Sequence, residues 1–116
     1  MKVIDKPAFL DTFQYFDKPI VVEIIDIFIN EYPDRIQRIE KAIREKDFTA
    51  LKFDAHSMKG VIANFVATEP HQLAKELEMK GMNQDGSSLD ELFEALKKST
   101  ISLIDDLKKL RPAFEE

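Results

Sequence analysis

One short segment of this chain combines three residue types that could do chemistry together: His56, Lys59 and Gly60. An imidazole is largely neutral at pH 7, and in that form its free nitrogen is a nucleophile. Residues three apart on a helix are neighbours, so the Lys59 ammonium can reach anionic atoms near His56. Glycine costs a helix about 1 kcal/mol relative to alanine, so Gly60 indicates a need for space. The segment therefore predicts a nucleophilic histidine on a helix surface, beside a cation and a gap.

The residues around His56 predict a helix from Phe48 to about Val66, with Asp47 as its N-cap. At ~100° per residue, one side of this helix is apolar and should face the core: Leu51, Ala55, Met58, Ile62 and Phe65. His56 falls roughly 140° from the centre of that stripe, so we expect it to be exposed. Two cations and two small residues should surround it on the exposed side: Lys52, Lys59, Gly60 and Ala63.

Two helical segments are predicted before this one. A short helix from about Pro7 to Tyr15 is expected to bury three apolar residues, namely Phe9, Leu10 and Phe13. A longer helix starts near Pro19, and Pro33 should kink or break it near Tyr32. The charges that follow form either a solvated face or a partner surface, and the solvated face is the simpler interpretation: Arg35, Arg38, Glu40, Lys41 and Arg44.

Two more helices are predicted after it. Thr68 can cap a helix from Glu69 to Lys80 that terminates at Gly81. The last helix runs from about Leu89 to Leu110, with these residues buried: Leu92, Leu96, Leu103, Ile104 and Leu107. Four main helices with short connections favour an all-α fold, an antiparallel up-and-down four-helix bundle with a short extra N-terminal helix. We expect residues 1–116 to form this single domain.

Composition excludes several classes of function. The chain has 116 residues, 44% apolar and 34% charged, as expected of one globular domain. It contains no cysteine, so disulfides, thiolate metal sites and thiol catalysis are excluded. A net charge of −5 argues against nucleic acid as a partner. No apolar run is long enough for a membrane span and the start lacks a signal sequence, so we expect no membrane association and a cytoplasmic location.

The run from His56 to Gly60, followed by Ala63, Asn64, Phe65 and Ala67, resembles the signature of histidine-containing phosphotransfer (HPt) domains. These domains are four-helix bundles of phosphorelays. The resemblance implies that His56 is the phosphoacceptor, loaded and emptied by aspartates on response-regulator receiver domains. It implies that Lys59 neutralises phosphoryl oxygens. It also implies that Glu78 hydrogen-bonds the imidazole, which would fix the tautomer and leave Nε2 as the nucleophile.

The same resemblance implies the partners. Receiver domains, and a hybrid histidine kinase, are the expected ones, with Lys52, Gly60 and Ala63 at the docking face. The receiver would supply Mg²⁺ and the aspartate, so this chain would be a carrier and not an enzyme, without a bound cofactor or metal. We expect a monomer, because no second apolar face stands out. The chain departs from the family pattern at three positions: Val61 and Ile62 are bulkier than usual, and Val66 replaces a common glycine.

Rival interpretations are weaker, with one exception. No glycine-rich nucleotide loop is present, which disfavours an ATP-dependent kinase. His56 and His71 are the only histidines and lack the one-turn spacing of a helical metal-ligand pair, so His71 is most simply a surface residue. The remaining alternative is a non-phosphorylated helical adaptor that binds a receiver or another signalling partner through the same face. Three aromatic residues could give that face apolar surface: Phe48, Phe53 and Phe65.

Overall fold

The computed structural model describes Ile4, residues 6–14 and residues 16–115, and all regular structure within these ranges is helical. The predicted all-α class is therefore confirmed. In chain order the elements are α1 (Lys6–Phe13), α2 (Lys18–Arg44), α3 (Phe48–Ile62), the 3₁₀ helix η1 (Ala63–Phe65), α4 (Thr68–Met82), α5 (Leu89–Leu110) and the 3₁₀ helix η2 (Arg111–Phe114).

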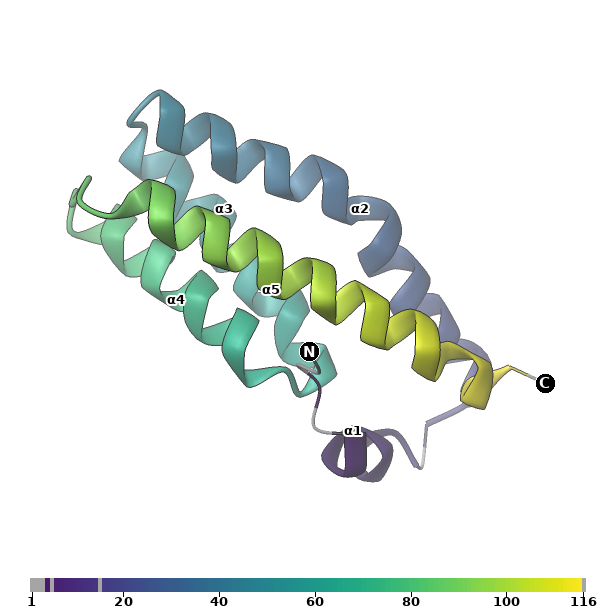
Figure 1. Ribbon diagram of the computed structural model, residues 1–116. Coiled ribbons are helices and arrows are strands. Elements are labelled where there is room, and N and C mark those ends of the chain that lie inside the picture. Colours follow the sequence, from purple (N-terminus) through teal and green to yellow (C-terminus); the bar gives the residue numbers. More distant parts are fainter. Residues whose placement is uncertain (1–3, 5, 15, 116) are drawn as a thin grey trace.

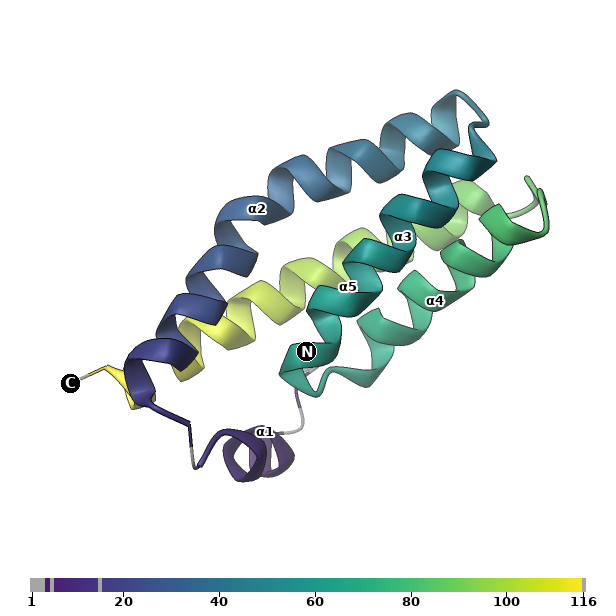
Figure 2. The same cartoon turned by 180° about the vertical axis from the view of Figure 1, so that it is seen from behind.

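Four long helices surround one apolar core. Helix α2 packs on α3, α3 on α4, α4 on α5, and α5 returns to α2 (Figure 1). The five residues of α3 and η1 that were predicted to face the core are all buried there. Helices α3 and α4 are shorter than α2 and α5, and α1 lies beyond their ends (Figure 2). Phe9 of α1 contacts Phe114 of η2, with ring centroids 5.9 Å apart, so α1 closes that end of the core.

The N-terminal part departs from the expectation at one residue. Phe9 and Phe13 are buried as predicted, and their rings lie 4.7 Å apart between centroids. Leu10 is 38% exposed, so its predicted burial is wrong. Helix α1 has only about two turns and lies across the end of the core. It therefore buries one narrow stripe of side chains, and Leu10 falls outside that stripe. Tyr15, the expected end of this helix, lies outside the described residues.

Helix α2 does not break at Pro33. It continues from Lys18 to Arg44, and the proline side chain is exposed on its surface. A proline removes a single hydrogen bond from a helix interior, while buried side chains on both sides of it, such as Phe28 and Ile39, keep the helix on the core. The axis of α2 changes direction along its length, as a proline causes (Figure 1).

The ends of α3 and the start of α4 agree with the prediction in part, and the connection between them shows why the family commonly has glycine at the position of Val66. Asp47 caps α3 as predicted, because its Oδ1 accepts from the Ala50 N–H at 3.0 Å. The α-helix ends at Ile62, short of the predicted Val66, and η1 continues it. Val66 has φ 53°, the left-handed conformation that favours glycine over a β-branched residue. Thr68 is not a cap: α4 begins at this residue, after Ala67.

Gly81 has a different role from the predicted helix terminator. Helix α4 runs past it to Met82, and Gly81 is buried against α3. A Cβ at this position would lie 2.7 Å from the backbone nitrogen of Lys52 and 2.9 Å from the carbonyl oxygen of Phe48. The glycine is therefore required because the backbones of α3 and α4 approach each other closely.

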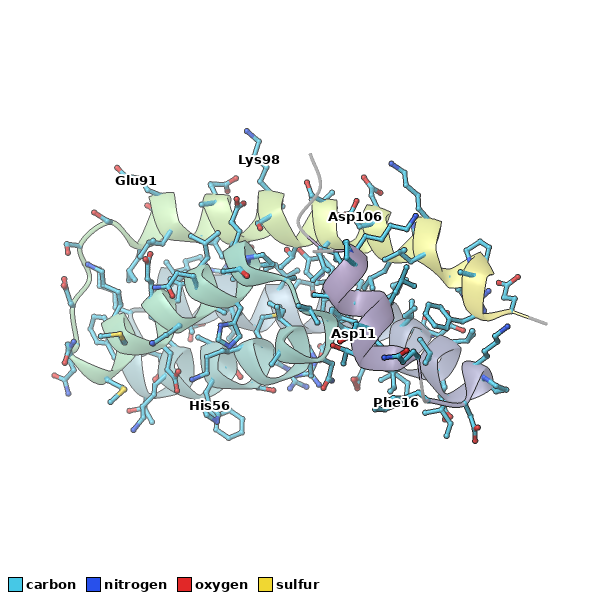
Figure 3. The ribbon with its side chains drawn as sticks, turned by 90° about the horizontal axis from the view of Figure 1, so that it is seen from below. Asp11, Phe16, His56, Glu91, Lys98 and Asp106 are labelled. Atoms are coloured by element: carbon cyan, nitrogen blue, oxygen red, sulfur yellow. The ribbon has the colours of Figure 1, made fainter. Side chains whose placement is uncertain are left out.

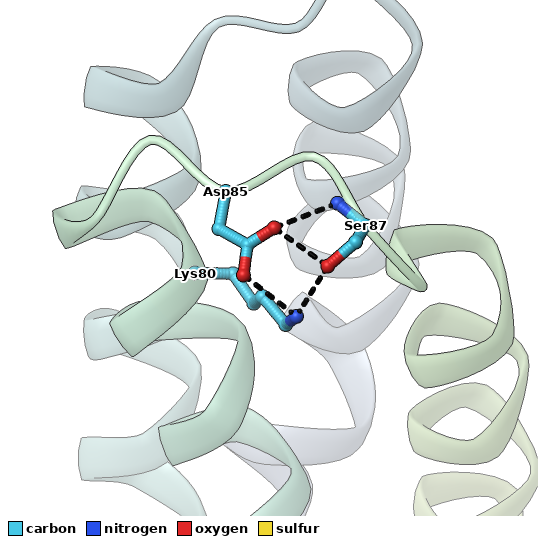
Figure 4. A network of polar contacts seen from close by, with 3 residues as sticks. All are labelled: Lys80, Asp85 and Ser87. Atoms are coloured by element: carbon cyan, nitrogen blue, oxygen red, sulfur yellow. Dashed lines mark hydrogen bonds and ion pairs between the residues drawn. The ribbon is translucent and has the colours of Figure 1, made fainter.

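The loop between α4 and α5 is held by one polar network (Figure 4). Lys80 Nζ donates to Asp85 Oδ2 at 3.0 Å and to Ser87 Oγ at 2.9 Å. The other carboxylate oxygen of Asp85 accepts from the Ser87 hydroxyl at 2.6 Å and from its backbone N–H at 2.9 Å. The Ser87 hydroxyl, then its N–H and Lys80, lower the pKa of Asp85 to about 2. These hydrogen bonds therefore hold the loop, up to the residue before the N-cap of α5, against the last turn of α4.

Candidate functional site

His56 lies on the outward face of α3. Its side chain is 67% exposed, whereas Ala55 and Met58 beside it are fully buried. In Figure 3 the labelled imidazole points to the opposite side of the molecule from Glu91 and Lys98 of α5. The helical periodicity that buries one stripe of α3 thus presents His56 to solvent, as the sequence predicted.

Three side chains from two helices meet at this imidazole. Glu78 of α4 lies with Oε2 2.6 Å from His56 Nδ1 and Oε1 2.6 Å from Lys59 Nζ. The Glu78 side chain is 12% exposed; its bond to Lys59 is partly buried, whereas its bond to His56 lies at the surface. The structure therefore brings together the three residues predicted for phosphoryl chemistry: His56, Lys59 and Glu78.

The charge state of Glu78 determines the tautomer of the imidazole. The hydrogen bond from Lys59 holds the pKa of the Glu78 carboxyl below its usual value; burial opposes this, and His56 adds to it. An ionised carboxylate can only accept, so His56 Nδ1–H must donate to it. In the neutral ring the lone pair then lies on Nε2, the nitrogen farther from Glu78.

Close packing of α3 on α4 sets the register that makes this contact. Gly81 touches the backbone of Lys52, as described above. His56 lies one turn after Lys52, and Glu78 lies one turn before Gly81, so the two side chains meet one turn along the seam. The glycine that governs the site geometry is therefore Gly81.

The residues predicted around His56 lie in two environments, exposed and partly buried. Lys52 and Ala63 are exposed, and a Cβ on the exposed Gly60 would have no atom within 4 Å, so space exists there as expected. Lys59, which we expected to be exposed, is only 24% exposed, because its ammonium reaches back to Glu78.

A further cation near the site, Arg35, was not predicted from the sequence to lie there. Arg35 of α2 donates from Nη1 to Ser57 Oγ at 2.6 Å, so its guanidinium contacts the residue that follows His56. Its Nη2 pairs with Glu31 at 3.2 Å. The sequence assigned Arg35 to a charged helix face; the contact with Ser57, 22 residues away, depends on how α2 packs on α3.

Other features are outside this cluster. His71 is half-buried in the first turns of α4. The described residues contain no group of three or more acidic or histidine side chains that could hold a metal ion, and among them no helix has the length and apolarity to cross a membrane. Phe53, one turn before His56, is 71% exposed, whereas Phe65 is buried and Phe48 half-buried.

An all-helical domain with an outward imidazole, oriented by a neighbouring helix, is the arrangement of a histidine phosphotransfer domain. Residues 23–111, most of the chain, match the Hpt domain family. The chain therefore belongs to the Hpt domain family. Its role is histidine phosphotransfer in a phosphorelay; Hpt proteins are carriers rather than true enzymes, and they interact with receiver domains and kinases.

One solved structure is similar over almost the whole chain. It is the crystal structure of histidine-containing phosphotransfer protein B (HptB) from Pseudomonas aeruginosa PAO1, with a TM-score of 0.86 and 21% sequence identity. The similarity covers 97% of each chain, and at this identity it concerns the fold. No curated protein matches the chain.

Proposed function

We propose that His56 is the phosphoacceptor of this Hpt protein and exchanges a phosphoryl group with receiver-domain aspartates. The observation that carries the proposal is the contact between His56 Nδ1 and Glu78 in a side chain that is 67% exposed. It directs the Nε2 lone pair away from Glu78, so that a docked partner can reach it.

The exchange follows from this geometry. The Nε2 lone pair attacks the phosphorus of an aspartyl phosphate; an N–P bond forms, the P–O bond to the aspartate breaks, and the carboxylate leaves with the bonding electrons. Glu78 stabilises the positive charge that develops on the imidazole, because it already accepts from Nδ1. Mg²⁺ bound to the receiver would neutralise the transferring group, and we expect this chain to bind no cofactor of its own. The same chemistry run backwards empties His56.

We assign the docking face to the exposed surface around His56. Lys52, Gly60 and Ala63 are exposed there, and Gly60 leaves open space above the helix. The bulk of Val61, which is half-buried, narrows this face on the side of α2. Receiver domains and a hybrid histidine kinase are the proposed partners.

We extend the proposal to the whole molecule. The cyclic contacts of the four long helices, with short connections from α2 to α3 and from α3 to α4, support an antiparallel up-and-down four-helix bundle as a single domain. We propose that it acts as a monomer in the cytoplasm.

One observation favours a second function. Phe53 exposes 71% of its surface beside His56, and an exposed aromatic residue is typical of a protein-binding face. A non-phosphorylated adaptor would use this face without any transfer of phosphate.

Phosphorylation assays separate the two functions. The wild-type protein is incubated with a phosphorylated receiver and Mg²⁺, in parallel with His56→Gln and with His71→Gln, which removes the other histidine. The wild type and His71→Gln should each gain one acid-labile phosphoryl group, and His56→Gln none. Equal labelling of His56→Gln would exclude His56 as the acceptor, and no labelling of any protein would favour the adaptor.

A further inference from the structure

The cluster at His56 leaves the incoming charge of a phosphoryl group unbalanced. Glu78 carries one negative charge and Lys59 one positive charge, and their atoms are 2.6 Å apart, so the pair is already neutral. A phosphoryl group brings roughly two negative charges near pH 7, and the positive charge on the phosphorylated imidazole balances only one of them. Lys59 has N–H donors to spare, but its single charge is already balanced by Glu78, which orients the imidazole. A further cation is therefore needed.

Arg35 lies on the opposite flank of His56 from this pair. The guanidinium contacts Ser57 on the side of α2, whereas Lys59 and Glu78 lie on the side of α4. Its side chain is 23% exposed, so it is largely held in place yet reaches solvent. Lys52, a third cation near His56, is exposed, and no side-chain hydrogen bond or ion pair holds it among the described residues.

The guanidinium also has hydrogen-bonding capacity to spare. Arginine has five N–H donors, and the bonds to Ser57 and Glu31 use two of them. The Nε of Arg35 is buried and has no partner among the described residues. Glu31, which balances the charge, is 50% exposed and lies at 3.2 Å, the geometry of a weak surface pair.

We propose that Arg35 is a phosphoryl-binding residue of the phosphorylated state: its guanidinium exchanges the Ser57 hydroxyl for oxygens of the phosphoryl group on His56. The inference rests on the proposed function of His56. Planar guanidinium groups bind phosphoryl oxygens with two parallel hydrogen bonds, which a lysine cannot do. Ser57 is half-buried, so water can replace the bond that its hydroxyl loses.

The first test measures the lifetime of phosphohistidine in the wild type and in four variants. Arg35→Gln should shorten it about tenfold, the loss of one charge-assisted hydrogen bond. Arg44→Gln is the control: it removes the same charge from the same helix, at a residue paired only with Glu40 at 3.7 Å. The lifetime for Arg35→Lys should lie between those of the wild type and Arg35→Gln. Ser57→Ala should leave the lifetime unchanged or longer, because Arg35 keeps its charge.

Two results would overturn the proposal. One is a lifetime for Arg35→Gln that equals that of Arg44→Gln. The other is an equal shortening by Ser57→Ala, which would mean that the contact only holds α2 on α3. If the wild type itself gains no phosphoryl group on His56, the proposed function fails instead.

The second test makes both measurements on the unmodified sequence, and a variant serves only to assign the resonance. Arginine side-chain ¹⁵N NMR spectra are compared before and after phosphorylation, with Arg35→Lys used for assignment. The Nε–H resonance of Arg35 should shift, and that of Arg44 should not. An unshifted Arg35 resonance would contradict the proposal.

Discussion

Glu78 connects two residues of the site through its two carboxylate oxygens, one to the imidazole and one to the ammonium. The bond to Lys59 keeps the carboxylate ionised, and the ionised carboxylate keeps the proton of the imidazole on Nδ1. Lys59 therefore acts on His56 through Glu78 as well as through its charge. At the scale of residues, Glu78 determines which nitrogen of His56 is the nucleophile, although the two residues are 22 positions apart.

The lowered pKa of Glu78 predicts a pH-dependent contribution to stability. The folded pKa lies below the usual 4.5, so the ion pair stabilises the fold fully above that value and loses its effect as pH falls through the folded pKa. Glu78→Gln should lower the free energy of unfolding by about 1 kcal/mol at pH 7, and by less at pH 3. Urea unfolding at both pH values measures the difference. Glu76→Gln is the control, because the one side-chain hydrogen bond of Glu76 among the described residues is from Gln72, at 3.5 Å. If Glu78→Gln lost the same free energy of unfolding at pH 7 and at pH 3, the ion pair of Glu78 would not be the source of that stability.

At the scale of elements, two glycines on neighbouring helices have opposite environments. Gly60 faces open space on α3, whereas Gly81 on α4 touches the backbone of α3. The close approach at Gly81 allows the two helices to lie in the register that joins His56 to Glu78. Gly60 contributes nothing to that packing, so its role is at the docking face.

Alanine at each glycine should therefore have opposite effects. Gly60→Ala should raise the free energy of unfolding by about 1 kcal/mol, because alanine favours the helix. Gly81→Ala should lower it by about 1–3 kcal/mol, because its Cβ would overlap the backbone at Lys52. Chemical denaturation of both variants tests this. If Gly81→Ala were as stable as the wild type, the close approach could not set the register.

At the scale of the whole molecule, the two long sides of the protein present different surfaces. His56 and Phe16 both point to the side opposite Lys98 (Figure 3). A groove lies between α2 and the last residues of α3 with η1; it is lined by Ile24, Ile27, Phe28, Glu31, Val61, Asn64 and Phe65. A receiver that docks on His56 is expected to cover this groove as well, since a specific interface buries roughly 800 Å² of each partner.

Two isoleucines of equal exposure test this expectation. Ile27 in the groove is 49% exposed, and Ile101 on α5 is 48% exposed. Ile27→Glu should weaken binding of the receiver about tenfold, because a charge replaces apolar contact area, and Ile101→Glu should leave it nearly unchanged. Titration calorimetry with an unphosphorylated receiver measures both affinities. Equal affinities for the two variants would place the docked partner away from this groove.

Much of this protein follows from local pattern. The helical period of apolar residues predicts α3, its buried stripe and the outward direction of His56, because each depends only on neighbours in the chain. The same locality explains the errors at Thr68 and Gly81. Both residues have familiar helix-end chemistry, but packing against other helices decided where α4 begins and ends.

Only the tertiary structure decided which distant side chains meet. The contact of Glu78 with Nδ1 was implied by family resemblance, and the residues alone could not predict it, because it depends on the register of α3 against α4. The contact of Arg35 with Ser57 and the partial burial of Lys59 depend on helix packing in the same way. Periodicity determines which way a side chain points; the distance between two helices, here set by a glycine without a side chain, determines what it touches.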